Sequence, residues 1–178
     1  MDFYVIDKQY IADLKTIDNR VGDIEYGATK LKFHLGIIIS VNNKNYYVPV
    51  SSPKSKHLKM SDSVDFIKIN HYSTGQLLCV LNLNNMIPAP SNCIQQLKRN
   101  NVETFRQFSN EAEKNNYIFL LDEEKISIKN KEAKIKKNAT KLYRICCNSP
   151  ESKIALRCCD FKKLEKVCEK WQTNQKDE

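Results

Sequence analysis

A short polar segment that follows an apolar strand gathers the groups most suited to phosphate chemistry. Residues 46–57 read YYVPVSSPKSKH, so serine hydroxyls, two lysines and an imidazole follow each other closely. Val48 and Val50 alternate with their neighbours as in a strand, and Pro53 ends it because proline cannot donate to a sheet ladder. Hydroxyls and amines on a rigid strand end suit the binding of a phosphate, although a solvated hairpin end has a similar composition.

Composition removes several other kinds of site. With four glycines the chain has neither a Walker loop nor a G-x-G-x-x-G turn. The strand-rich part offers no pair of carboxylates with the spacing of a two-metal nuclease, so we expect no metal and no cofactor. His34, His57 and His71 leave open a ribonuclease-like pair of acid and base histidines.

The seven cysteines do not follow a metal-binding pattern. Cys146-Cys147 and Cys158-Cys159 are adjacent pairs rather than C-x-x-C, and no histidine lies near them. We interpret them as reduced, packed thiols of a cytoplasmic protein. Neither a membrane-length apolar run nor a signal-like N-terminus is present, which supports the same location.

Metal-free phosphoryl transfer on RNA remains, because the ribose 2′-hydroxyl supplies the nucleophile there. The protein has only to position the phosphate, stabilise its charge and manage two protons. The groups available for the first two tasks are Ser51, Ser52, Lys54 and Lys32, and those for proton transfer or base stacking are Tyr10, Tyr26 and His57. Each also has a plainer reading as a core aromatic, a loop residue or a solvated strand-edge residue.

The charge of the chain favours a polyanionic partner. The net charge is +8 and the pI is about 9.1, and the basic residues concentrate in 30–68 and in 125–144. Two basic stretches, one strand-rich and one helical, can form a groove for RNA. The candidate RNA contacts are Tyr26, which precedes the first stretch, then Lys30, Lys56, His57 and Lys59 within it, and Lys125, Lys129, Lys136, Lys137 and Lys141 in the second.

The elements that must position these groups follow from periodicity and caps. We expect strands at 1–5, 33–41, 46–51, 64–69, 76–83 and 93–97, with a turn at 42–44. Helices are expected from the Asp7 cap to about residue 19, over 103–121 and 123–147, and from the Asp160 cap onward. The chain then forms one domain, sheet-rich over 1–100 and helical over 101–178.

Several ordered blocks resemble the ToxN/AbiQ/CptN family of type III toxin–antitoxin endoribonucleases. The blocks are Phe3-Tyr4 with Tyr10-Ile11, then Leu35-Gly36-Ile37-Ile38, then Tyr47 to Lys54 with His57, then Leu81 to Pro88. The resemblance implies an α+β fold with a strongly bent antiparallel sheet like that of the Kid/MazF toxins, surrounded by an N-terminal helix and C-terminal helices. It also implies sequence-specific, metal-independent RNA cleavage that leaves 2′,3′-cyclic phosphate and 5′-hydroxyl ends.

The resemblance further implies an RNA partner and assigns roles. A pseudoknotted repeat RNA, cut from its precursor by the toxin, would inhibit it in a cyclic protein–RNA assembly, and the system would act in phage defence by abortive infection. The family's key serine falls on Ser52, its supporting groups on Ser51, Lys54, Lys32 and Tyr10, and its loop tyrosine on Tyr26. Two alternatives stay open: a non-catalytic RNA-binding regulator on the same fold, and a toxin neutralised by a protein.

Overall fold

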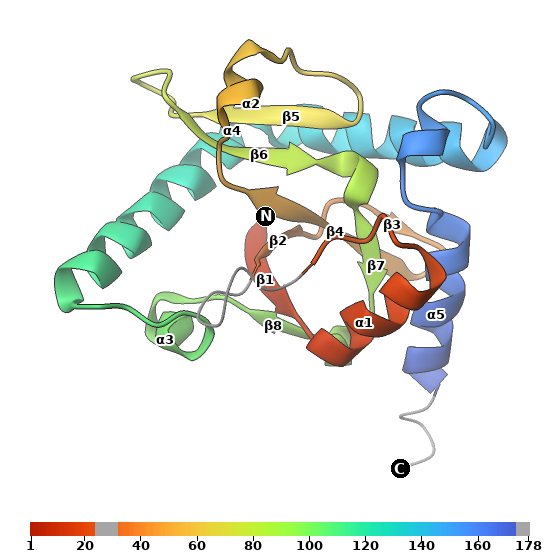
Figure 1. Ribbon diagram of the computed structural model, residues 1–178, viewed down its shortest axis with the longest axis horizontal. Helices are drawn as coiled ribbons and strands as arrows, with labels where there is room; N and C mark the ends of the chain where they lie inside the picture. Colours follow the sequence, from red (N-terminus) through yellow and green to blue (C-terminus); the bar gives the residue numbers. More distant parts are fainter. Residues whose placement is uncertain (24–31, 174–178) are drawn as a thin grey trace.

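The computed structural model describes residues 1–23 and 32–173, and its centre is an antiparallel sheet (Figure 1). The main path runs β5-β6-β4-β2-β1-β8, and β3 and β7 also pair with β4. The strands are β1 (Asp2–Ile6), β2 (His34–Gly36), β3 (Ser40–Val41), β4 (Lys44–Ser51), β5 (Phe66–Asn70), β6 (Leu77–Asn82), β7 (Ile87–Ala89) and β8 (Ile94–Gln96). The predicted α+β class with an antiparallel sheet is confirmed.

Strand β4 organises this sheet because it changes partners half-way along its length. Its first half pairs with β3 and β7, with Tyr46 opposite Pro88. Its second half pairs with β2 and β6, where Pro49 lies opposite His34 and Ser51 opposite Val80. The C-terminal end of β4, which carries the polar segment, is thereby held on both sides.

The strand predicted over 33–41 is interrupted, which corrects the sequence interpretation. Strand β2 ends at Gly36, and β3 begins four residues later. A Cβ atom on Gly36 would lie 2.1 Å from the ring of Tyr47, so only glycine lets this ring lie against the backbone. The predicted turn is confirmed: Asn42 and Asn43 have φ values of 50° and 57°, a conformation that asparagine tolerates.

The helices agree with the prediction at the ends of the chain and differ in its middle. Helix α1 (Lys8–Ile17) begins at the Asp7 cap, whose carboxylate accepts the Tyr10 amide at 2.9 Å. Helix α5 (Phe161–Thr173) begins after Asp160, whose carboxylate accepts the Lys163 amide at 3.1 Å. Short helices α2 (Ser55–Lys59) and α3 (Val102–Phe105) occupy a predicted turn and the beginning of a predicted helix.

The two helices predicted over 103–121 and 123–147 are wrong as separate elements. Instead, α4 (Glu111–Asn148) is a single helix of 38 residues. Glutamate is a good helix former, so the acidic residues at the predicted break do not end the helix. Glu123 Oε2 lies 2.5 Å from His71 Nε2, and Glu124 is buried beside Cys79. The first half of α4 extends away from the sheet, and its second half passes alongside β5 (Figure 1).

One cluster of buried side chains joins the sheet to the helices. Tyr46 of β4 packs edge-on against Tyr143 of α4 and against Phe161 of α5. The carboxylate of Glu165, which is 5% exposed, accepts hydrogen bonds from both tyrosine hydroxyls through Oε1, at 2.8 Å and 2.6 Å. Helices α4 and α5 thus hold strand β4 in place through Tyr46. Within the described residues, no helix has the length and apolarity needed to cross a membrane.

Candidate active site

The polar segment at the end of β4 forms the wall of a pocket of about 380 Å³. Its lining residues are Ser51, Ser52, Pro53, Lys54, Lys56, His57 and Asn82. Five of the residues that the sequence nominated are therefore brought together. Among the described residues that line this pocket there is no carboxylate, so its polar surface consists of hydroxyls, amines, an imidazole and an amide.

The local backbone explains why these groups converge. Strand β4 ends at Ser51, Pro53 follows it, and α2 begins at Ser55, so only three residues separate the strand from the helix. The amide of His57 donates to the Lys54 carbonyl at 2.8 Å, and the Lys54 amide donates to His57 Nδ1 at 3.1 Å. This reciprocal pair places the imidazole against the strand end, while Ser52 and Lys54 stay exposed.

His57 is held as a neutral imidazole. Burial lowers its pKa from the ordinary value of 6.5, and the positive charges of Lys56 and Lys54 lower it further. Because Nδ1 accepts the Lys54 amide, the hydrogen of the neutral ring sits on Nε2. The ring packs on Phe66 at 5.6 Å between centroids, which restricts its orientation. Near pH 7 this side chain is therefore a hydrogen-bond donor through Nε2.

Asn82 is a pocket residue to which the sequence analysis assigned no role. It ends β6, and its Nδ2 donates to Ser51 Oγ at 3.4 Å across the β4–β6 pairing. A polar residue at the end of an apolar strand was the available signal. The pairing of that strand with β4 was not visible in the sequence, so the contact was not predicted.

Lys32 approaches the site from the neighbouring strand without lining the pocket. The Val50 amide donates to the Phe33 carbonyl at 3.0 Å, which extends the β2–β4 register and sets the backbone of Lys32 opposite Ser51. Its ammonium lies over Gly22, where a Cβ would be 3.3 Å from Nζ. Burial and the charge of Lys32 lower the pKa of buried His34 to about 3, so that ring stays neutral.

Tyr10 requires a correction, because the structure places it in the core. The residue is 0% exposed, and its hydroxyl donates to the Pro88 carbonyl at 2.6 Å. Trp171 packs edge-on against its ring. A fully buried side chain cannot contact a nucleotide, so the expected direct contact is wrong for this conformation. Tyr10 instead braces β7, which pairs with β4.

The candidate RNA-binding lysines fall on two surfaces. Lys59 is exposed on α2, outside the pocket. Lys129, Lys136, Lys137 and Lys141 are exposed along α4, and the partly buried Lys125 pairs with Asp2 at 3.1 Å. The nearby Lys131 donates to the Lys68 carbonyl at 2.7 Å, and the exposed Lys134 pairs with Asp62 at 2.6 Å. Tyr26 and Lys30 lie outside the described residues.

Comparisons with known proteins agree with the resemblance seen in the sequence. The chain is 27% identical over 174 residues to Endoribonuclease ToxN of Bacillus thuringiensis subsp. kurstaki, an alignment that covers 96% of this chain and 84% of that protein. Two solved structures match with a TM-score of 0.79 each, at 23% and 22% identity. They cover 95% and 97% of this chain and 98% of their own chains.

The solved structures are described in terms of RNA regulation. The first is described as "A processed non-coding RNA regulates a bacterial antiviral system". The second is described as "New insights into the mechanism of bacterial Type III toxin-antitoxin systems: selective toxin inhibition by a non-coding RNA pseudoknot". The model of the family described as Toxin ToxN, type III toxin-antitoxin system, matches residues 2–169. Because that match spans nearly the whole chain, the protein belongs to the ToxN family of type III toxin–antitoxin toxins.

Proposed function

We propose that the protein is an endoribonuclease toxin that cleaves specific RNA sequences without a metal ion. The observation that carries the proposal is the pocket at the end of β4, where serine hydroxyls, Lys54, Lys56 and His57 converge. Such groups suit a phosphodiester, because they supply hydrogen bonds and positive charge to an anion. The name of the Bacillus thuringiensis relative supports the same activity.

The proposed reaction uses the RNA's own nucleophile. The ribose 2′-hydroxyl attacks the adjacent phosphorus, the bond to the 5′-oxygen breaks, and the products are a 2′,3′-cyclic phosphate and a 5′-hydroxyl. Ser52, which is exposed at the pocket, donates to a non-bridging oxygen. Ser51 assists it, and the Ser51 hydroxyl is oriented by the hydrogen bond that it accepts from Asn82. Lys54 offsets the charge that grows on those oxygens in the transition state.

His57 completes the phosphate site as a neutral donor. Its Nε2–H donates toward the phosphate, while the Lys54 amide fixes Nδ1 as the acceptor. Protonation of Nδ1 would break that amide contact and open the turn between β4 and α2. The charges of Lys54 and Lys56, which lower the imidazole pKa, therefore also protect the geometry of the pocket near neutral pH.

Lys32 and Tyr10 support this site from outside the pocket. The backbone of Lys32 lies opposite Ser51, and its ammonium, which lies over Gly22, adds positive charge outside the pocket. Tyr10 holds the Pro88 carbonyl of β7, and β7 pairs with the first half of β4. Tyr26 remains a proposed base-stacking residue on the basis of the family resemblance alone.

We infer that the inhibitor is a small repeat RNA, as the descriptions of the two similar structures suggest. The exposed lysines of α4 and Lys59 of α2 would bind its backbone, while its end occupies the pocket. The toxin would cut this RNA from a repeat precursor and close with it into a cyclic assembly in the cytoplasm. Release from the RNA during phage infection would stop growth of the infected cell.

The test is cleavage by protein stripped of RNA under denaturing conditions and refolded. With A-rich RNA in excess EDTA, we expect fragments that end in 2′,3′-cyclic phosphate, identified by mass spectrometry. Activity that requires added divalent cations would overturn the metal-free mechanism. Tight RNA binding without any cleavage would instead favour the non-catalytic regulator. A protein that inhibits cleavage where the operon's repeat RNA does not would favour a protein antitoxin.

A further inference from the structure

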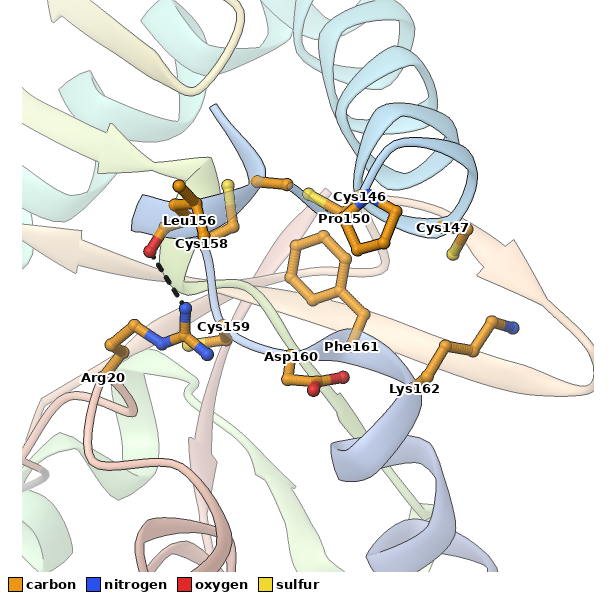
Figure 2. A pocket seen from close by; sticks show the side chains of 11 residues that line it. Arg20, Cys146, Cys147, Pro150, Leu156, Cys158, Cys159, Asp160, Phe161 and Lys162 are labelled. Carbon is orange, nitrogen blue, oxygen red and sulfur yellow. Dashed lines mark hydrogen bonds between the residues drawn. The ribbon is translucent and has the colours of Figure 1, made fainter. Parts of the chain in front are cut away.

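A second pocket, of about 210 Å³, lies at the C-terminal end of α4 (Figure 2). The proposed RNA cleavage does not use it. The end of α4, the segment before α5 and Arg20 enclose it. Four of the seven cysteines line it: Cys146, Cys147, Cys158 and Cys159. The sequence analysis interpreted the seven cysteines as reduced, packed thiols, and all seven are free in the structure.

Two of these thiols, Cys146 and Cys158, come from the two chain segments that enclose the pocket. Cys146, in the last turn of α4, is partly exposed, whereas Cys158, just before α5, is fully buried. Both side chains line the pocket, and Cys158 Sγ donates to the Ile154 carbonyl at 3.1 Å. Figure 2 shows both side chains reaching into the space between the end of α4 and the chain that leads to α5. A thiol at the surface of the pocket is thus paired with a sheltered one.

Electrostatics distinguish Cys146 from its neighbours. The neighbouring Cys158 side chain lowers the Cys146 pKa, burial opposes this, and the positive charge of Arg20 adds to the lowering. The Cys146 side chain and burial raise the pKa of Cys158. Burial likewise raises the pKa of Cys147, and that of Cys159 to about 12. Cys146 is therefore the thiol of this pocket best suited to react as a thiolate.

We propose that Cys146 and Cys158 form a peroxide-sensitive dithiol that oxidises to an intramolecular disulfide. The Cys146 thiolate attacks hydrogen peroxide, the O–O bond breaks, and a sulfenic acid and hydroxide form; the hydroxide takes up the proton that the Cys146 thiol released and becomes the first water. The Cys158 sulfur then attacks Cys146, the S–O bond breaks, and its thiol proton leaves with the oxygen in a second water. Two thiols and one peroxide thus give one disulfide and two waters, and the two sulfurs close to about 2.05 Å.

The disulfide would join two elements that lead toward the candidate active site. It ties the end of α4 to the segment that carries Arg157, whose Nε lies 2.5 Å from an Asp65 carboxylate oxygen. Asp65 precedes Phe66, the ring on which His57 packs. Oxidation therefore fixes one end of a continuous chain of contacts between the cysteine pocket and the imidazole.

Peptide mapping tests the proposal without relying on activity. Trypsin cuts after Arg144, Lys153, Arg157 and Lys162, which places the two thiols on separate peptides, 145–153 and 158–162. The folded protein is treated with hydrogen peroxide, free thiols are blocked with N-ethylmaleimide, and digestion follows without reductant. We expect a species that joins the two peptides, with N-ethylmaleimide on Cys147 and Cys159, lighter by two hydrogen atoms than the sum of the two peptides blocked at those positions, and absent after dithiothreitol.

Matched serine variants assign the sulfurs. Cys147→Ser, one residue away and similarly exposed, should keep the cross-link, whereas Cys146→Ser should lose it. Fragmentation of the wild-type cross-link gives the same assignment even where a variant folds poorly. A link through Cys147 or Cys159, oxidation of Cys146 to sulfinate without any link, or a disulfide between two molecules would each overturn the proposal.

Discussion

The buried carboxylate of Glu165 should hold the sheet and helices together through one oxygen. Oε1 accepts from Tyr46 of β4 at 2.8 Å and from Tyr143 of α4 at 2.6 Å, and Oε2 accepts from Lys162 at 3.0 Å. Glu165→Ala removes both phenol acceptors. Glu165→Gln keeps a carbonyl oxygen at the Oε1 position and changes only the group that faces Lys162.

The two substitutions should therefore differ in cost. Each buried phenol left without an acceptor costs about 2 kcal/mol, so Glu165→Ala should lower the free energy of unfolding by about 4 kcal/mol. The half-exposed Lys162 contributes less than about 1 kcal/mol, which sets the cost of Glu165→Gln. At roughly 2–4 °C per kcal/mol, the Tm should fall by about 8–16 °C in Glu165→Ala and by about 2–4 °C in Glu165→Gln.

Calorimetry at pH 7, with urea unfolding as a second measure, checks the difference. Equal Tm values for the two variants would show that the shared Oε1 acceptor does not join β4 to the helices. An unchanged Tm in Glu165→Ala would refute the whole network. Lys162→Met is the control that removes only the exposed partner, and it should behave like Glu165→Gln.

The contribution of the Glu165 hydrogen bonds to the Tm should be lost at low pH. Burial opposes ionisation of Glu165, but hydrogen bonds from Tyr143, Tyr46 and Lys162 outweigh it and hold its pKa below the ordinary value of 4.5. A carboxyl with a lowered pKa in the folded state stabilises the protein above its unfolded pKa and loses that contribution as the pH falls through the folded pKa. The Tm difference between wild type and Glu165→Gln should stay constant above about pH 4.5 and close below it.

Three further predictions concern the site and its RNA. Asn82→Ala removes one long hydrogen bond to Ser51, which is worth about 0.5–1.5 kcal/mol. The kcat/KM for RNA cleavage should therefore fall roughly 2- to 10-fold with an unchanged Tm. A loss above 1,000-fold would show that Asn82 acts directly on the substrate. His57→Gln should remove an acid limb of the pH–rate profile, whose midpoint lies below 6.5 in the wild type because the histidine pKa is lowered; an unchanged limb would exclude His57 as its origin. Replacing Lys136, Lys137 and Lys141 together with glutamine should flatten the slope of log RNA affinity against log salt concentration by about two, since each phosphate contact on single strands contributes about 0.7. An unchanged slope would show that the RNA binds away from these lysines.

Local signals in the sequence were enough to predict the elements around the site. The Asp7 cap predicted α1, and the paired asparagines predicted the turn. The alternation of side chains predicted β4, and Pro53 predicted its end. The convergence of Ser51, Ser52, Lys54 and His57 also followed from their closeness along the chain. These features depend on neighbouring residues, which a pattern can reveal.

Features that depend on distant partners could not be predicted. Asn82 is hydrogen-bonded to Ser51, which lies 31 residues away in the sequence. Glu165 is hydrogen-bonded to Tyr46, which lies 119 residues away. The partners of Glu123 and Glu124 within helix α4 are His71 and Cys79, which come from other parts of the fold. Helix α2 has five residues and no apolar period, so its exchange of hydrogen bonds between Lys54 and His57 was not visible either.

RNA cleavage by Ser52→Ala, compared with Ser55→Ala, tests the central claim most directly. Ser52 lines the pocket, whereas Ser55 is an exposed serine three residues later that does not. We expect Ser52→Ala to lose roughly 100- to 1,000-fold in the cleavage rate constant, as when one donor to a developing charge is removed, while its RNA affinity and Tm are retained. Ser55→Ala should cleave like the wild type. Full cleavage by Ser52→Ala, at wild-type stability, would contradict the assignment of the β4 strand end as the site of RNA cleavage.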